Sequence, residues 1–452
     1  MVSEPAHTGQ SSPRRRFYFE FVLICLIVSL GAVESYSVSF YRFRLVDLVL
    51  ILGSIYFIRL VMKGEINRKT VWLLFIYGCY IVARMAYGPN VAEGTETKQT
   101  LFGMSALYLT PLIFFVVRES YINFRISAML LVIACGVSIL SQLGLLSWGE
   151  SYVSGAVNLA SIFGIERRDG GIVLDYMETT ITIWRALSVG VTLAVLLTKT
   201  PLWMKALGVL GLILQYTGGG GDRSALLFVF FLPLVLYSWQ GSLSRGSRIR
   251  KLFWAGALGI SLAGVYLWAP IGGSNPTKSA GSSHFERATD IFILFTDGWG
   301  EAEAAGGFSA RTIVYGQYVE AIVSDPSVFL FGTGLSKGAA FEWTPLGGLA
   351  HNMILDVWGL TGLVGLMFFL VFFGCVISDL KSMLKATPQE TVQQIISFSY
   401  GGAVLYMIQY MLVQPTTADR SFMIVFCLAS GFLKPITRWI KNYTVHSVKL
   451  IS

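Results

Sequence analysis

The stretch MILDVWGLTGLVGLMFFLVFFGCVI, residues 353–377, has Asp356 as its only charged residue. A helix of these 25 residues is long enough to cross a bilayer, which needs about 20 apolar residues. Runs of this kind recur along the 452-residue chain, which is 54% hydrophobic and 13% charged. Soluble domains carry about 25% charged residues. The sequence therefore predicts an all-α polytopic membrane protein.

Twelve apolar segments are expected to span the membrane. A β-barrel is disfavoured because its strands would alternate polar and apolar residues in segments of about 10. The five cysteines each fall within an apolar segment and form no CxxC pair, which indicates packing rather than disulfide or metal chemistry. The predicted spans are 17–34, 45–62, 70–87, 101–117, 126–146, 179–198, 202–217, 224–240, 252–271, 353–377, 394–413 and 421–434.

The connections between these spans alternate in basic content, and Lys and Arg favour the cytoplasmic side. This pattern predicts that both termini are cytoplasmic, although Arg42 and Arg44 in the first outer loop oppose it. No cleavable signal is expected before the first span. Three regions follow: spans one to nine in 1–271, a large, partly helical outer loop in 272–352, and spans ten to twelve with a cytoplasmic tail in 353–452. A second outer segment covers 147–178.

The segment TGGGGDRSALLF, Thr217 to Phe228, is predicted to turn at the outer surface between two spans. Its glycines permit a tight turn, and Asp222 is one residue that can cap the following helix. Arg223 at a helix N-terminus would favour an anion. The alternative is a flexible hairpin whose arginine reaches the interface. No GK[ST] follows, so a nucleotide-binding P-loop is excluded.

The outer loop contains SARTIVYGQYVEAI, which predicts an amphipathic helix over 308–324 that stops at Asp325-Pro326. Arg311 lies near its start. His351 and Asn352 open the tenth span, behind which Gly359, Gly362 and Gly365 are expected to form one small-residue face for close helix packing. Taken singly, Arg311 reads as a solvated arginine and His351 as a structural hydrogen bonder.

Taken together, these residues indicate a catalytic site, because all are predicted at the outer membrane surface. Arg185 lies near the outer end of span six, where a charge needs a partner or a watery cavity. Guanidinium groups match phosphate oxygens, and a neutral histidine suits proton removal from a hydroxyl. The expected reaction is transfer from a lipid diphosphate to an alcohol. No metal or cofactor is expected, since no cluster of Asp, Glu or His is evident.

The stretches RTIVYGQYVEAIVSDPSVFLFGTG and AHNMILDVWGLTGLVGLMFFL resemble the signature of the O-antigen ligase and O-antigen polymerase superfamily of bacterial membrane glycosyltransferases. The turn GGGGDRSALL is similar to the family's Ser-Arg turn, although Asp222 stands where serine is commoner. The motifs cover about 217–370. The resemblance implies a GT-C-like fold in the inner membrane and an undecaprenyl-diphosphate-linked glycan donor, used on the periplasmic face.

The resemblance also implies roles for single residues. Arg223 and Arg311 would hold the diphosphate, His351 would deprotonate or orient the acceptor hydroxyl, and Asn352 would brace the outer end of span ten. The anomeric carbon would be inverted, and electrostatic stabilisation of the departing diphosphate would be the largest contribution. Arg185, Asn352 and Asp222 are the expected substrate-binding residues.

The acceptor divides the family. A polymerase uses another lipid-linked repeat unit, and a ligase uses the lipid A core. Asp356 after the leucine of HNMILD favours the polymerase. A lipid-linked glycan transporter or flippase remains as another class, since twelve spans are common in transporters, but the two halves show no matching pattern. Membrane lipids and a chain-length regulator are further candidate partners. Nucleic acid is not expected, because the net charge of +8 is spread over short loops.

Overall fold

A computed structural model describes residues 35–38, 41–64, 66–86, 110–119, 177–217, 232–241, 244, 246–254, 256–257, 309–334, 350, 352–388, 391–413 and 420–449. Helices dominate these residues, and the only strands among them form one short antiparallel pair. The elements are β1 (Ser35–Val38), β2 (Tyr41–Arg44), α2 (Leu45–Met62), α3 (Arg68–Ala86), α5 (Thr110–Glu119), α8 (Met177–Leu197), α9 (Leu202–Thr217), α11 (Leu232–Trp239), α15 (Ser309–Ser324), α16 (Pro326–Phe331), α18 (Met353–Ala386), α19 (Thr391–Val413) and α20 (Arg420–Lys449).

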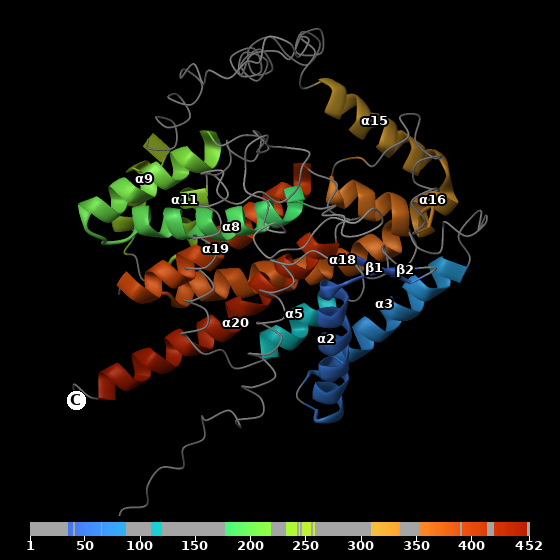
Figure 1. The fold of residues 1–452 in the computed structure, drawn as a ribbon, viewed down its shortest axis with the longest axis horizontal. Coiled ribbons are helices and arrows are strands. Elements are labelled where there is room, and N and C mark those ends of the chain that lie inside the picture. The colour runs from blue at the N-terminus through green and yellow to red at the C-terminus, as the bar shows by residue number, and fades with distance from the viewer. Residues whose placement is uncertain are drawn as a thin grey trace, which may run out of the picture.

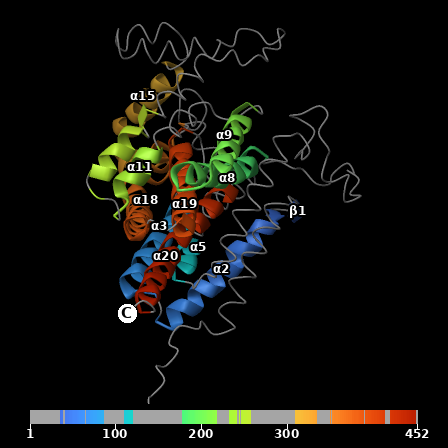
Figure 2. The ribbon, with the colours of Figure 1, turned by 90° about the vertical axis from the view of Figure 1, so that its left-hand side faces the viewer.

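The three C-terminal helices α18, α19 and α20 run through the middle of the fold (Figure 1). Helices α8, α9 and α11 lie on one side of them, and α2, α3 and α5 lie on the other. Helix α8 packs along α19, and α5 packs along α20. The view turned by 90° keeps α15 near one end of the bundle and the C-terminal end of α20 near the opposite end (Figure 2).

The helix bounds agree closely with the predicted spans. Helices α2 and α9 coincide with 45–62 and 202–217, and α3, α8 and α19 differ from prediction by one to three residues at an end. Among the described residues, two helices are long and apolar enough to cross a membrane: Met353–Ala386 and Val392–Leu412. The predicted spans 17–34 and 126–146, most of 252–271, and the first parts of 101–117 and 224–240 lie outside the described residues.

Three features differ from the predictions. Helix α18 continues past 377 to Ala386, and α20 continues past 434, through Pro435, to Lys449. Hydropathy places an end where charges begin, but a helix can continue where those charges are paired, as Asp379 and Lys434 are here. The third feature is the strand pair, because it adds a small sheet to an expected all-α fold. Ser35 pairs with Arg44, and Val38 pairs with Tyr41.

Small residues allow α8 and α19 to approach closely. A Cβ added at Gly190 of α8 would overlap the carbonyl oxygen of Ser399 in α19. A Cβ added at Gly402 of α19 would lie 3.2 Å from the Cα of Gly190. Helices that lack side chains at the crossing can bring their backbones together, which increases van der Waals contact. Gly190 and Gly402 therefore set the distance between α8 and the central helices.

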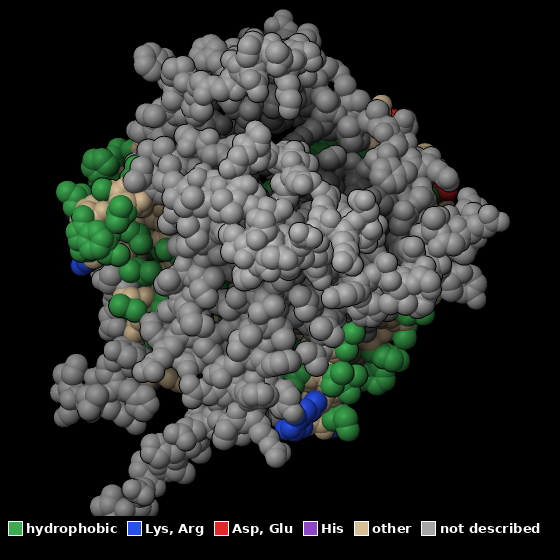
Figure 3. Space-filling model, viewed as in Figure 1, with side chains coloured by type: hydrophobic (Ala, Val, Ile, Leu, Met, Phe, Trp, Pro, Cys, Tyr) green, Lys and Arg blue, Asp and Glu red, His purple; other side chains and the backbone are tan. Residues whose placement is uncertain are grey.

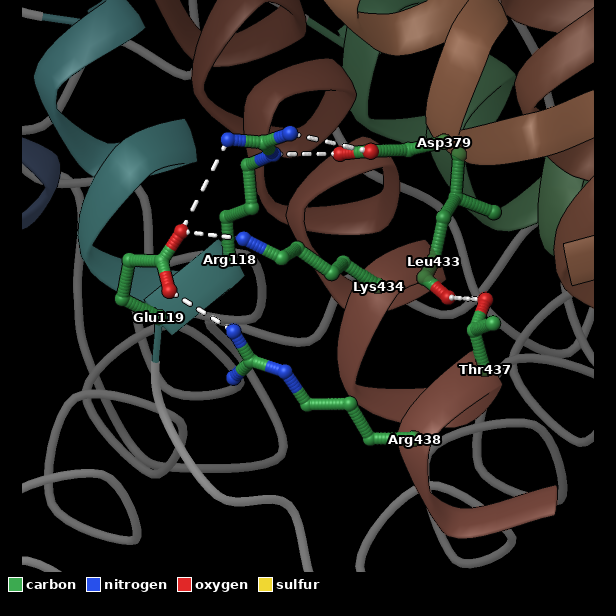
Figure 4. Close-up of polar contacts among 7 residues, drawn as sticks. All are labelled: Arg118, Glu119, Asp379, Leu433, Lys434, Thr437 and Arg438. Atoms are coloured by element: carbon green, nitrogen blue, oxygen red, sulfur yellow. Dashed lines mark hydrogen bonds and ion pairs between the residues drawn. The ribbon is translucent and has the colours of Figure 1, made fainter. Parts of the chain in front are cut away.

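An ion-pair network joins α5 to two central helices (Figure 4). The Arg118 guanidinium donates to Asp379 of α18 through Nε and through Nη2, the latter at 3.0 Å. The Glu119 carboxylate accepts from Lys434 Nζ at 2.6 Å and from Arg438 Nη2 at 2.7 Å, both on α20. Paired hydrogen bonds between guanidinium and carboxylate are stronger than neutral ones. The network fixes one end of α5 against α18 and α20.

Replacing Gly190 by alanine is expected to destabilise the fold by about 1–3 kcal/mol, the usual range for overpacking. The added methyl group would overlap backbone, which cannot turn aside as a side chain can. Gly374→Ala is the matched control, because no atom lies within 4 Å of its added Cβ and alanine favours helix. Thermal unfolding of both variants in detergent tests this. Equal midpoints for the two variants would contradict the packing at Gly190.

Acidification is expected to weaken the ion-pair network. Burial raises the pKa of Glu119, but hydrogen bonds from Lys434 and Arg438 outweigh burial and leave that pKa below its ordinary value of 4.5. A lowered pKa stabilises the fold above the ordinary pKa, and the stabilisation is lost as pH falls through the lowered value. The thermal unfolding midpoint, measured at decreasing pH from pH 7, should therefore start to decrease once the pH is below about 4.5. The fall should be smaller in Glu119→Gln and unchanged in Glu320→Gln, whose carboxyl is exposed.

Candidate functional site

The predicted site residues fall into two groups. Asp222, Arg223 and His351 lie outside the described residues. Arg185 is in the first half of α8, and Arg311 is the third residue of α15. Asn352 directly precedes α18. The structure thus describes the backbone at three of the six positions and the side chain of Asn352 alone.

Asn352 is the N-cap of α18. Its side-chain oxygen accepts hydrogen bonds from the backbone N–H groups of Ile354 at 3.0 Å and Leu355 at 3.3 Å. The first N–H groups of a helix have no partner within the helix, and asparagine is among the best residues to supply one. Asn352 therefore holds the first turn of α18 by these two hydrogen bonds. Its side-chain oxygen is committed to the helix.

Asp356 holds the chain on the other side of His351. Its carboxylate accepts the backbone N–H of Ala350 at 2.7 Å, and both residues are fully buried. An aspartate in the first turn also interacts favourably with the helix dipole. The neighbours of His351, Ala350 and Asn352, are thus both tied to the first turn of α18.

Helix α15 packs against this same end of α18. Tyr318 and Ile322 form a small buried cluster with Val328 and Ala350, against which Leu355 and Trp358 also pack. Burial, and after it the charge of Asp356, raises the pKa of Tyr318, so its hydroxyl stays protonated. Arg311 precedes Tyr318 by seven residues, which is about two helical turns or roughly 10 Å. It therefore shares the helical register of the tyrosine that packs beside Ala350.

The expected outer helix is confirmed in extent, since α15 covers 309–324 where 308–324 was predicted. Asp325 ends it and caps α16, accepting from Ser327 N at 2.8 Å and Ser327 Oγ at 2.7 Å. The amphipathic character is less simple than predicted. Tyr318 and Ile322 are buried, but Val319 and Val323 are exposed. The helix has apolar residues on both faces.

Helix α18 is broken at Gly362, where φ is 67° and ψ is −174°. A break leaves the last carbonyl groups of the first half, Met353–Thr361, without helical partners. Thr333 N donates to Gly359 O at 2.8 Å, and Gly334 N donates to Leu360 O at 3.0 Å. Thr361 O accepts the hydroxyl of Tyr80 from α3. Residues 333–334, which follow α16, and the Tyr80 side chain of α3 therefore cap the half-helix.

Two glycines make this capping possible. A Cβ on Gly362 would overlap the backbone at Leu330, and a Cβ on Gly332 would overlap the backbone at Leu360. Both residues have φ near +70°, which side chains disfavour. Two further donors reinforce the contact: Arg84 Nη2 donates to Gly332 O at 2.6 Å, and Trp358 Nε1 donates to Phe329 O at 3.2 Å.

The structure corrects the predicted glycine face of span ten. Gly359, Gly362 and Gly365 were expected to form one face for another helix, but Gly362 is not helical. Gly365 faces the side chain of Thr361 within α18. A neighbouring segment does approach α18 closely at Gly362, but this segment is the backbone of residues 330–332 and not another helix. The glycine spacing could not distinguish these outcomes, because both require small residues.

Sequence reasoning missed Tyr80 and Arg84, which hold the break in α18 from outside. A signal was present, because Arg84 is a charged residue within the predicted span 70–87, and such residues are costly unless paired.

Comparison with known protein families and with curated proteins finds no match to this chain. The resemblance to the O-antigen ligase and polymerase superfamily therefore stays a prediction from the motifs.

Replacing Asn352 separates a capping role from a substrate-binding role. Asn352→Ala should cost about 1 kcal/mol of stability, the usual value of an N-cap, and should reduce whatever activity depends on the start of α18. Asn352→Ser should restore both, because a hydroxyl oxygen also accepts from the second and third N–H groups. Unfolding midpoints give the stability. A serine variant as impaired as the alanine variant would show that the amide itself is needed.

Proposed function

We propose that this chain is an inner-membrane protein of about twelve spans with both termini in the cytoplasm. Large apolar side chains are exposed on several helices and gather on the flanks of the molecule (Figure 3). On α2 the exposed residues Ile51, Ile55, Ile58 and Met62 form a single stripe. Exposed apolar surface of this extent is unusual on soluble monomers, and lipid would cover it.

The contacts between helix ends support the proposed topology. Glu119, Asp379 and Lys434 meet in one network. Glu119 and Asp379 follow spans whose ends are predicted to be cytoplasmic, and Lys434 is the last residue of such a span. Toward the other end, Arg84 contacts Gly332 of the predicted outer loop, and Tyr80 contacts Thr361. Arg84 and Tyr80 lie within the predicted span 70–87, and Thr361 lies within the outer half of the predicted span 353–377. These contacts fit the relative orientations of the helices in the proposed topology.

Within this topology we propose that the protein is a polysaccharide polymerase of the O-antigen type. It would transfer a glycan from undecaprenyl diphosphate to a hydroxyl of a second lipid-linked repeat unit at the periplasmic face. The observation that carries the proposal is the anchored start of α18. His351 lies between two residues tied to that helix end, and the helix bearing Arg311 packs against the same end.

The proposed reaction uses these residues as follows. The acceptor oxygen attacks the anomeric carbon as the carbon–oxygen bond to the diphosphate breaks, and His351 takes the hydroxyl proton. Arg223 and Arg311 stabilise the charge that develops on the diphosphate, with Arg185 and Asp222 as further substrate contacts. Preorganised charge is often the largest contribution to catalysis. Anchoring His351 would reduce the reorganisation that proton transfer requires.

Ligation to the lipid A core is the alternative use of the same site. The preference for polymerisation comes from Asp356, which the structure ties to Ala350. That contact serves a polymerase and a ligase equally, so the choice of acceptor has to come from an assay.

The assay gives purified protein lipid-diphosphate repeat units, alone or with lipid A core. We expect a ladder of products from the repeat units alone. Arg223→Ala, Arg311→Ala and His351→Ala should each lower the rate by at least about a hundredfold, as loss of a charge-stabilising or proton-transfer group does. Arg311→Lys should also be weak, because a lysine lacks the bidentate fork.

Arg68→Ala is the control, since Arg68 is exposed at the start of α3, and it should keep wild-type activity. A product that forms only with lipid A core would identify a ligase. Movement of intact substrate across vesicles without product would identify a flippase. If all three alanine variants gave the same product ladder as the wild type, the proposed mechanism would be contradicted.

A further inference from the structure

A second region brings basic side chains together at the opposite end of the bundle from Asn352. It lies where the end of α8, the end of α11 and the helical residues 246–254 meet. The Tyr237 hydroxyl of α11 donates to Leu197 O of α8 at 2.6 Å. Lys251 Nζ lies 5.0 Å from the centre of the Tyr237 ring. Arg248 of this region donates to Gln240 O at 3.1 Å. Three further charged residues lie here, Lys199, Arg250 and Lys251, which we call the basic corner.

The basic corner is formed by segments that contain no acidic residue. The chain has no Asp or Glu in 198–217 or in 232–257, the segments that form the corner. No ion pair involves Lys199, Arg250 or Lys251 within the part of the chain that the structure describes. Burial lowers the pKa of Lys251, and the charges of Lys199 and Arg250 lower it further. The three cations repel one another, so an anion that binds among them relieves the repulsion.

Exposed aromatic side chains border the basic corner. Trp203 lies in the first turn of α9, four residues after Lys199, and Phe253 and Trp254 follow Lys251. All three are more than 60% exposed. The rings of Phe253 and Trp254 pack edge to face with centroids 5.9 Å apart. Tryptophan beside Lys or Arg is typical of the membrane–water interface, where the ring lies at headgroup depth.

We infer that the basic corner binds the headgroup of an anionic phospholipid, such as phosphatidylglycerol. The phosphate would lie among Lys199, Arg250 and Lys251, and the acyl chains would lie along Trp203, Phe253 and Trp254. Basic pockets between helices at the cytoplasmic surface are known to bind anionic headgroups. Free phosphate would match the cations but would leave the aromatic residues uncovered. The inference rests on the proposed membrane topology, but it uses none of the residues assigned to glycan transfer and is independent of that reaction.

The full-length protein in an uncharged detergent provides the test. Native mass spectrometry measures the binding of phosphatidylglycerol and of phosphatidylcholine with the same acyl chains. We expect phosphatidylglycerol to bind more tightly. The triple variant K199A/R250A/K251A should bind it about a hundredfold more weakly, since each cation near a membrane surface contributes about fivefold. The double variant R68A/K69A, which removes two exposed cations elsewhere, should bind as wild type.

The other outcomes are equally decisive. Equal binding of the two lipids, or wild-type affinity in the triple variant, would overturn the inference. Inorganic phosphate that displaces the lipid at similar concentration would show that the site binds free phosphate. If the triple variant does not fold, the salt dependence of the wild-type protein decides. Lipid binding should weaken from 0.1 to about 1 M salt as charges are screened, and binding that salt leaves unchanged would contradict the role of the cations.

Discussion

The break in α18 imposes the constraint on which the described structure depends. A helix interrupted at Gly362 exposes carbonyl groups that must find donors, and within a membrane the lipid would supply none. The donors come from Thr333 and Gly334 after α16 and from Tyr80 of α3. Segments separated by 26 and 281 residues are thereby joined at one point. Gly332 and Gly362 permit the contact because a side chain on either would overlap the opposing backbone.

This constraint also determines what the first half of α18 can do. The half-helix Met353–Thr361 is capped by Asn352 at its start and by α3 and residues 333–334 at its end. Tyr318 and Ile322 of α15 pack against its first turns, and Asp356 ties back Ala350. At the other end of α18, Asp379 is paired with Arg118. A catalytic group beside Asn352 would therefore be held by a helix that is fixed at both ends, as the proposed reaction requires.

The sequence predicts the helices better than their contacts. Span limits such as 45–62 and 202–217 follow from hydropathy, because apolar runs end where polar residues begin. The end of α15 at Asp325-Pro326 also follows from local residue chemistry. The break at Gly362 could not be predicted, since its cause is the backbone of residues 330–332. Tyr80, Arg84 and the ion pairs of α20 were missed because each partner lies hundreds of residues away. Arg223 and His351 remain predictions, because they lie outside the described residues.

The central claim is that Arg223, Arg311 and His351 surround one site at the start of α18. Cross-linking of cysteine pairs in a cysteine-free background tests it most directly, with a reagent no longer than a sugar diphosphate. The pair at Tyr318 and Ala350, which the structure packs together, is the positive control, and Arg311 paired with Arg118 is the negative control. We expect the pairs 223–311 and 311–351 to cross-link in membranes as the positive control does. If both pairs behave like the negative control, the residues do not share a site and the proposed mechanism is wrong.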